Sequence, residues 1–178
     1  MGTNRILFER GGWGVKCTAI FRVPPLTSKT CFDFLAHTDE APYIDGRKTP
    51  VKLAAMLERY DSLPAEAKAW CEKMRAGFAN RKIQINKTLS DGEILPVCGG
   101  IEVIHTPGHT PGHICLLLKE SGVLVGGDAI NIADGKIAGP NIQQSYDIEL
   151  APQSFEKIKK YPINAVISYH CGYIRIDE

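Results

Sequence analysis

The stretch HTPGHTPGH, residues 105–113, is the most informative part of this chain. Its histidines, His105, His109 and His113, are four residues apart, a spacing that would align them on one face of a helix. A helix is excluded, because each repeat contains a proline, which lacks an amide donor and clashes with the preceding turn. The stretch therefore predicts a strand that ends near His105 and enters a loop. Because two prolines restrict this loop, it loses little conformational entropy when it holds an imidazole in place as a ligand. Taken alone, each histidine is more simply interpreted as a hydrogen-bonding residue of a turn.

Two apolar runs further along the chain end in groups that can bind metal. Residues 123–127 (VLVGG) lead into Asp128, and residues 165–169 (AVISY) lead into His170. Ligands and catalytic groups gather at strand ends and loops, because the hydrogen bonds of the strands hold the scaffold in place. An aspartate in such a place is otherwise a turn or cap residue, and a histidine there is otherwise a surface group. Together with the loop histidines, the two runs favour a metal site.

Strands dominate the middle of the chain and helices flank them. Hydrophobic periodicity predicts helices at about residues 49–60, 62–77 and 148–161. Short apolar or alternating runs predict strands at residues 83–86, 101–105, 114–118, 123–125 and 165–169. The residues expected to be buried on the second helix are Ala67, Trp70, Cys71 and Met74. This order of elements predicts an α/β (α+β) fold in which helices partly cover both faces of a sheet.

Composition indicates one globular domain with no electrostatic preference for polyanions. The chain has 178 residues, 44% of them hydrophobic and 23% charged, and its formal net charge is +1. This balance favours neither nucleic acid nor an anionic membrane as a partner. The six cysteines form no C-x-x-C pair, and no apolar run is long enough for export or for crossing a membrane. We therefore expect reduced thiols and a cytoplasmic location.

The motifs occur in an order that resembles a known family. Residues 106–113 (TPGHTPGH), then 127–128 (GD), then 169–170 (YH) are similar to the second half of the metallo-β-lactamase superfamily, and the gaps of 19 and 42 residues between the expected ligands also fit. The likeness covers about residues 35–178 and is strongest for small bacterial hydrolases and the glyoxalase II branch. It implies an αββα sandwich with a binuclear metal site, usually zinc, at one edge. This chain would hold mainly the C-terminal half of that sandwich.

Carried over by position, the resemblance implies a role for each motif residue. His109 would bind the first metal and His170 the second. Asp128 would bridge both metals and act as the catalytic residue. His113 would hydrogen-bond behind the site, and Gly127 would let the backbone pass close to the metals. The resemblance further implies one or two zinc ions as the cofactor.

The implied chemistry is hydrolysis of a small molecule. In the family, a metal-bound hydroxide attacks an ester, thioester, amide or phosphoester while the metal polarises the substrate oxygen.

One family motif is missing. The remaining metal ligands of the family come from an H-x-H-x-D-H motif ahead of the loop, and the 178 residues do not contain it. The only histidine before residue 105 is His37, in AHTDE at residues 36–40, and neither this segment nor His105 is interpreted as part of the metal site. Each ion would retain one imidazole and a share of Asp128, whereas a catalytic zinc normally has three protein ligands. The sequence thus predicts either a hydrolase impaired by this loss or an inactive remnant that binds metal weakly or acts by interaction.

The chain divides into an unassigned segment, residues 1–34, and an incomplete metallo-β-lactamase-like domain, residues 35–178. A truncated or frame-shifted gene would explain the abrupt onset of likeness. The alternative is a divergent N-terminal segment that completes the fold in another way. Loss of the early strands would expose a sheet edge, which opens a route to self-association.

Overall fold

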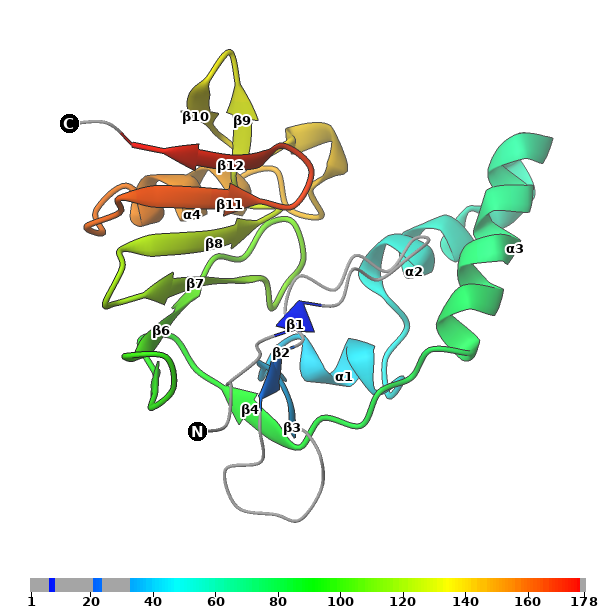
Figure 1. Ribbon diagram of the computed structural model, residues 1–178. Helices are drawn as coiled ribbons and strands as arrows, with labels where there is room; N and C mark the ends of the chain where they lie inside the picture. Colours follow the sequence, from blue (N-terminus) through cyan, green and yellow to red (C-terminus); the bar gives the residue numbers. More distant parts are fainter. Residues whose placement is uncertain (1–6, 9–20, 24–32, 177–178) are drawn as a thin grey trace.

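The computed structural model describes residues 7–8, 21–23 and 33–176, so the unassigned segment 1–34 lies almost entirely outside the described residues. Two sheets form the centre of the molecule (Figure 1). The described residues of the first sheet form four strands in the order β1-β2-β3-β4, in which only β3 and β4 are parallel. These strands are β1 (Leu7–Phe8), β2 (Phe21–Val23), β3 (Asp33–His37) and β4 (Lys87–Leu89).

The second sheet has six strands within the described ranges, in the order β12-β11-β8-β7-β6-β5. They are β5 (Ile94–Leu95), β6 (Ile101–His105), β7 (Ile114–Leu118), β8 (Val123–Gly127), β11 (Ala165–Ser168) and β12 (Gly172–Arg175). All neighbours are antiparallel except β8 and β11, which are parallel. Both of these strands therefore end at the same edge of the sheet. A separate hairpin, β9 (Asn131–Ala133) and β10 (Lys136–Ala138), follows β8.

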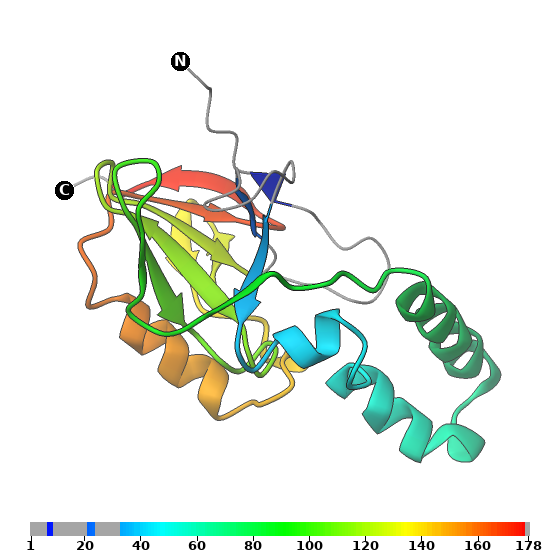
Figure 2. The ribbon, with the colours of Figure 1, turned by 90° about the horizontal axis from the view of Figure 1, so that it is seen from below.

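The helices lie on opposite sides of the sheets. They are α1 (Ala41–Ile44), α2 (Val51–Glu58), α3 (Ala65–Ala79) and α4 (Leu150–Ile158), with short 3-10 turns at Tyr60–Ser62 and Ile142–Gln144. Figure 2 shows α4 beside the six-stranded sheet, whereas α2 and α3 extend away from both sheets. Among the described residues, no helix combines the length and apolar character needed to cross a membrane.

Alternate side chains along the strands of the six-stranded sheet point to opposite faces, and each face packs against a different layer. One face of the six-stranded sheet packs against β3 and β4 in a shared core: Leu35, Leu89, Leu95, Ile101, Val103, Ile114, Leu116 and Val125. The opposite face packs against α4 through a second core: Ile104, Cys115, Leu117, Leu124, Ala129, Ile130, Ile158 and Val166. On the far side of β3, Ala36 packs against Ala41 and Ile44 of α1. The layers are therefore α4, six-stranded sheet, four-stranded sheet and α1, the αββα order that the resemblance implies.

The α/β prediction is confirmed, and two local predictions are wrong. The segment predicted as a strand at residues 83–86 lies outside both sheets: the Ile83 amide donates to the Ile44 carbonyl (3.2 Å), the Asn86 amide is the first to bond to β3, at the Phe34 carbonyl (2.9 Å), and β4 begins at Lys87. Trp70 was expected in the core but is 48% exposed. Cys71 and Met74, which were also expected to be buried on this helix, are buried and pack against α2.

Candidate metal centre

His109 lies on the loop between β6 and β7, and this loop is fixed at both ends. The Thr106 amide donates to the His113 carbonyl (2.8 Å), which closes the loop on itself. Gly108 has a φ of +133°, and a Cβ there would lie 2.4 Å from the Cα of Ala151 in α4. Only glycine allows this close approach between loop and helix. The loop therefore delivers His109, which is 3% exposed, into the interior beside α4.

Asp128 and His170 come together because β8 and β11 are parallel neighbours. Ser168 at the end of β11 pairs with Gly127 at the end of β8, and the Tyr169 amide donates to the Gly127 carbonyl (3.2 Å). Gly127 has a φ of +57°, which turns the chain so that Asp128 leaves the sheet at its edge. Asp128 is 7% exposed, whereas the side chain of His170 is 54% exposed.

The three predicted ligands meet at this edge, with Asp128 in the middle. Nε2 of His170 lies 3.0 Å from Oδ1 of Asp128, and Nε2 of His109 lies 3.5 Å from Oδ2. Each imidazole therefore faces a different oxygen of the same carboxylate. Ligands bonded to one zinc ion at tetrahedral angles lie about 3.3 Å apart, so each observed nitrogen–oxygen pair has the separation of two ligands on one ion.

The burial of Asp128 also fits a bound cation. Its Oδ2 atom is buried and has no hydrogen-bond partner. A buried carboxylate oxygen without a partner is unfavourable, and a metal ion is one of the few groups that can compensate for it. Imidazole nitrogen and carboxylate oxygen are also donors that zinc accepts readily. The residues present therefore fit a divalent metal, which His109, Asp128 and His170 would hold.

His113 lies behind the cluster and orients Asp128. It is fully buried, and the Asp128 amide donates to its Nε2 atom (3.3 Å). The hydrogen must then be on Nδ1, which donates to Oγ1 of Thr106 (2.7 Å). Burial, followed by the charge of His105, lowers the pKa of His113 from 6.5 to about 3. His113 is therefore neutral near pH 7 and keeps the acceptor that the Asp128 amide needs.

Two adjoining cavities open onto the cluster. One, of about 170 Å³, is lined by His109, Asp128, Asn131, Asn141, Gln144 and His170. The second, of about 390 Å³, shares His109 and Gln144 with the first. Its other wall residues include Tyr43, Pro50, Val51 and Trp70, which are apolar or aromatic. A substrate could place an apolar group in the larger cavity and a polar group beside the cluster.

Lys52 and the amides Asn131, Asn141 and Gln144 are site residues that the sequence did not reveal. Nζ of Lys52 lies 3.5 Å from Nε2 of His109 and donates to the Gln144 carbonyl. A lysine on an ordinary helical face carries no sequence signal of this kind, and the three amides belong to a hairpin and loop without a recognisable motif. His105 points elsewhere, since its Nε2 lies 3.0 Å from the Pro111 carbonyl.

The layered sheets and the cluster at their edge define a class, the metallo-β-lactamase fold. A model of the metallo-beta-lactamase superfamily matches residues 34–170. The probable metallo-hydrolase YflN of Bacillus subtilis (strain 168) is 30% identical over 155 residues, which are 78% of this chain and 57% of YflN. An N-acyl homoserine lactonase of Bacillus sp. is 32% identical over 75 residues, 39% of this chain and 28% of the lactonase. This chain therefore belongs to the metallo-beta-lactamase superfamily.

Solved structures show the same fold. The metallo-beta-lactamase family protein TTHA1429 from Thermus thermophilus superimposes with a TM-score of 0.57 at 22% identity, over 79% of this chain and 47% of that protein. The archaeal superfamily protein ST1585 from Sulfolobus tokodaii gives a TM-score of 0.52 at 17% identity, over 79% and 52% of the two chains. The chain thus spans about half the length of the relatives it matches.

Proposed function

We propose that this chain is a divalent-metal-dependent hydrolase of small molecules, acting on an ester, thioester, amide or phosphoester bond. The observation that carries the proposal is the position of Asp128, whose two oxygens each face an imidazole beside two cavities. A bound metal would supply Lewis-acid chemistry, by polarising a substrate oxygen and by making water more acidic. The partial likeness to an N-acyl homoserine lactonase makes a lactone the first ester to test.

The chain's own residues would bind and orient the substrate. The apolar wall formed by Tyr43, Val51 and Trp70 would hold the apolar part and exclude water from it. Lys52, in the wall of the larger cavity next to His109, would place a positive charge near a substrate carbonyl or anionic group. His113 would keep the Asp128 carboxylate directed at the cluster, because it accepts the Asp128 amide hydrogen. Zinc is the first metal to test, given the two imidazoles and one carboxylate.

A second candidate is a metal-binding chain without turnover. The observation that favours it is the absence of H-x-H-x-D-H from the 178 residues, so that His109, Asp128 and His170 would be the protein ligands available at the cluster. Both candidates predict metal binding that depends on Asp128, but only the first predicts hydrolysis.

The test combines zinc titration with four assays on the full chain. After removal of metal by a chelator, zinc binding is measured by calorimetry, and hydrolysis is measured on an acyl homoserine lactone, a thioester, a p-nitroanilide and bis-p-nitrophenyl phosphate. Asp128→Asn is compared with Asp61→Asn, the same chemical change at an exposed position. The hydrolase is supported by zinc-dependent turnover that Asp128→Asn reduces more than about 100-fold.

The other outcomes are equally informative. Loss of one or more bound zinc equivalents in Asp128→Asn, without turnover of any substrate by the unmodified chain, would refute the hydrolase and support the second candidate. Equal zinc binding by Asp128→Asn and Asp61→Asn would refute both.

A further inference from the structure

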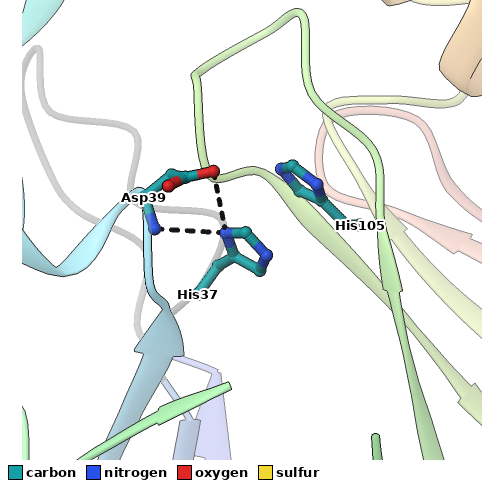
Figure 3. A group of neighbouring side chains, drawn as sticks. All are labelled: His37, Asp39 and His105. Atoms are coloured by element: carbon teal, nitrogen blue, oxygen red, sulfur yellow. Dashed lines mark hydrogen bonds and ion pairs between the residues drawn. The ribbon is translucent and has the colours of Figure 1, made fainter. Parts of the chain in front are cut away.

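A second group of metal-binding residues lies away from the Asp128 cluster. His37 is the last residue of β3 in the four-stranded sheet, and His105 is the last residue of β6 in the six-stranded sheet. Their rings stack with centroids 3.8 Å apart and planes inclined by 12°. Asp39 follows on the same loop as His37, and Figure 3 shows its carboxylate beside the two rings. Each of the three residues offers one ligand atom, and these atoms all lie within 4.8 Å of one another.

Each imidazole makes one hydrogen bond, and a metal ion at Nδ1 of His37 would displace the one made there. The Asp39 amide donates to Nδ1 of His37 (3.2 Å), so this nitrogen is unprotonated and faces Asp39. The Pro111 carbonyl can only accept, so Nε2 of His105, 3.0 Å away, carries a hydrogen, and Nδ1 is the nitrogen that a metal ion would bind. Neutral imidazoles are the form that binds metal.

The surrounding charges favour a cation. Asp39 lies with its Oδ2 3.6 Å from Nδ1 of His37 and contributes a negative charge. The other charged groups that act on His37 are Asp91 and Lys157, which neutralise each other through a 2.7 Å ion pair. The local balance is therefore one negative charge, that of Asp39, next to the two imidazoles.

We propose that His37, Asp39 and His105 form a second metal site, which takes a borderline divalent cation such as Zn²⁺ and joins the two sheets. Two imidazoles and a carboxylate are a donor set suited to zinc, with water completing the shell. The site shares no residue with the Asp128 cluster or with the cavities that open onto it. It would serve as a structural clip, because its ligands come from the ends of strands in different sheets.

Metal binding requires a defined movement of the side chains. An ion lies in the plane of each imidazole that binds it, so two nearly parallel rings 3.8 Å apart cannot both bind as they stand. One ring must turn about its Cβ–Cγ bond, and the ligand atoms must approach to about 3.3 Å. The Asp39 side chain is 58% exposed and therefore has room to swing toward the ion. Binding would thus exchange the ring stack for coordination.

A metal ion bound by His37, Asp39 and His105 would also restrict the loop that carries His109. The segment after His37 contacts this loop directly, since the Gly112 amide donates to Oε2 of the buried Glu40 (2.8 Å). His105 contacts the same loop at the Pro111 carbonyl. An ion between His37 and His105 would therefore fix the loop to the four-stranded sheet and raise the unfolding temperature of the protein.

The test separates this site from the Asp128 cluster. In the full chain carrying Asp128→Asn and His170→Asn, zinc is titrated by calorimetry and Co²⁺ by visible absorption. We expect one equivalent of either metal to bind, with a higher unfolding temperature. Adding Asp39→Asn should weaken this binding more than about tenfold, because even partners outside a ligand set change affinity about 10- to 100-fold. Adding Asp61→Asn, at another exposed aspartate, should change nothing.

Imidazole ¹⁵N spectra provide an independent reading. Zinc should shift one ring nitrogen of His37 and one of His105, with assignments made from His37→Gln and His105→Gln. No zinc binding by the Asp128→Asn, His170→Asn chain would overturn the clip, as would equal affinities with Asp39→Asn and Asp61→Asn. Neither result would bear on hydrolysis, which is measured with the Asp128 cluster intact.

Discussion

Replacing Gly108 by alanine should damage both the fold and the metal centre. A Cβ at this position would lie 2.4 Å from the Cα and 2.5 Å from the nitrogen of Ala151. These are backbone atoms of α4, so no side-chain rotation can relieve the clash. Since ordinary contacts begin at 3.4 Å, the loop and α4 must separate by about 1 Å. His109 is the next residue and must move with the loop.

The loss of stability in Gly108→Ala has two parts, backbone strain and overpacking, and Gly135→Ala serves as a control for the first. Gly135 also has a positive φ, +69°, but a Cβ there would meet no atom within 4 Å. Gly135→Ala therefore reports the strain of a left-handed alanine alone, about 1–2 kcal/mol. Gly108→Ala adds overpacking, typically about 1–3 kcal/mol. Since the φ of Gly108, +133°, is less accessible to alanine than the φ of Gly135, the total loss should be at least about 2–5 kcal/mol. Because a misplacement near 1 Å can reduce the function of a positioned group about 100-fold, zinc affinity should fall as well.

Urea unfolding of the metal-free chain measures the first effect, and zinc titration measures the second. The reasoning requires Gly108→Ala to be less stable than Gly135→Ala and to bind zinc more weakly. Equal stability of the two variants, or unchanged zinc affinity in Gly108→Ala, would show that the loop does not depend on its contact with α4.

Groups near the cluster give three further predictions. The ammonium of Lys52 lies 3.5 Å from Nε2 of His109 and should repel a zinc ion bound there by at least about 1 kcal/mol. Lys52→Met should therefore tighten zinc binding about tenfold in calorimetry, whereas Lys48→Met should leave it unchanged. Acid should destabilise the metal-free chain, because burial in the folded state lowers the pKa of His113 to about 3. As pH falls from 6.5, the unfolded state takes up the proton first, so the free energy of unfolding measured in urea should fall by up to about 4–5 kcal/mol in total. His113→Asn should show a smaller pH dependence. Thr106→Val should cost about 1–3 kcal/mol in urea unfolding, because it leaves the Nδ1 hydrogen of His113 buried without an acceptor; a neutral effect would contradict the assigned tautomer.

The residues predicted as ligands have sequence signals that are local. Proline and glycine in residues 105–113 exclude a helix whatever surrounds them, and short apolar runs before Asp128 and His170 predict strands. The structure does bring His109, Asp128 and His170 together, with nitrogen–oxygen distances of 3.5 and 3.0 Å. Periodicity could not reveal the parallel pairing of β8 and β11, because it reports one element at a time. The closeness of the ligands therefore rested on the family resemblance.

What the sequence did not predict depends on distant contacts. Trp70 has helical spacing suited to burial, but the buried face of α3 is set by where α2 lies, and Trp70 faces a cavity instead. The burial of Glu40 depends on the Gly112 amide, 72 residues away. His37 and His105 are likewise far apart along the chain, and a histidine pair at such a separation gives no recognisable motif.

The energetics of Asp128 link metal binding to folding even with few ligands. In the metal-free chain its buried Oδ2 lacks a hydrogen bond, a deficit of about 1–3 kcal/mol that the fold must already bear. A cation that binds Oδ2 removes this deficit, so its binding free energy includes the same amount, about 1–3 kcal/mol, in addition to the energy of its own bonds. This gain is equivalent to roughly 5- to 150-fold in affinity. His113 and Thr106 act in the same direction, since they hold the Asp128 backbone in place before any ion arrives. A centre with two imidazoles and one shared carboxylate should therefore bind zinc more tightly than the same three groups in a flexible peptide.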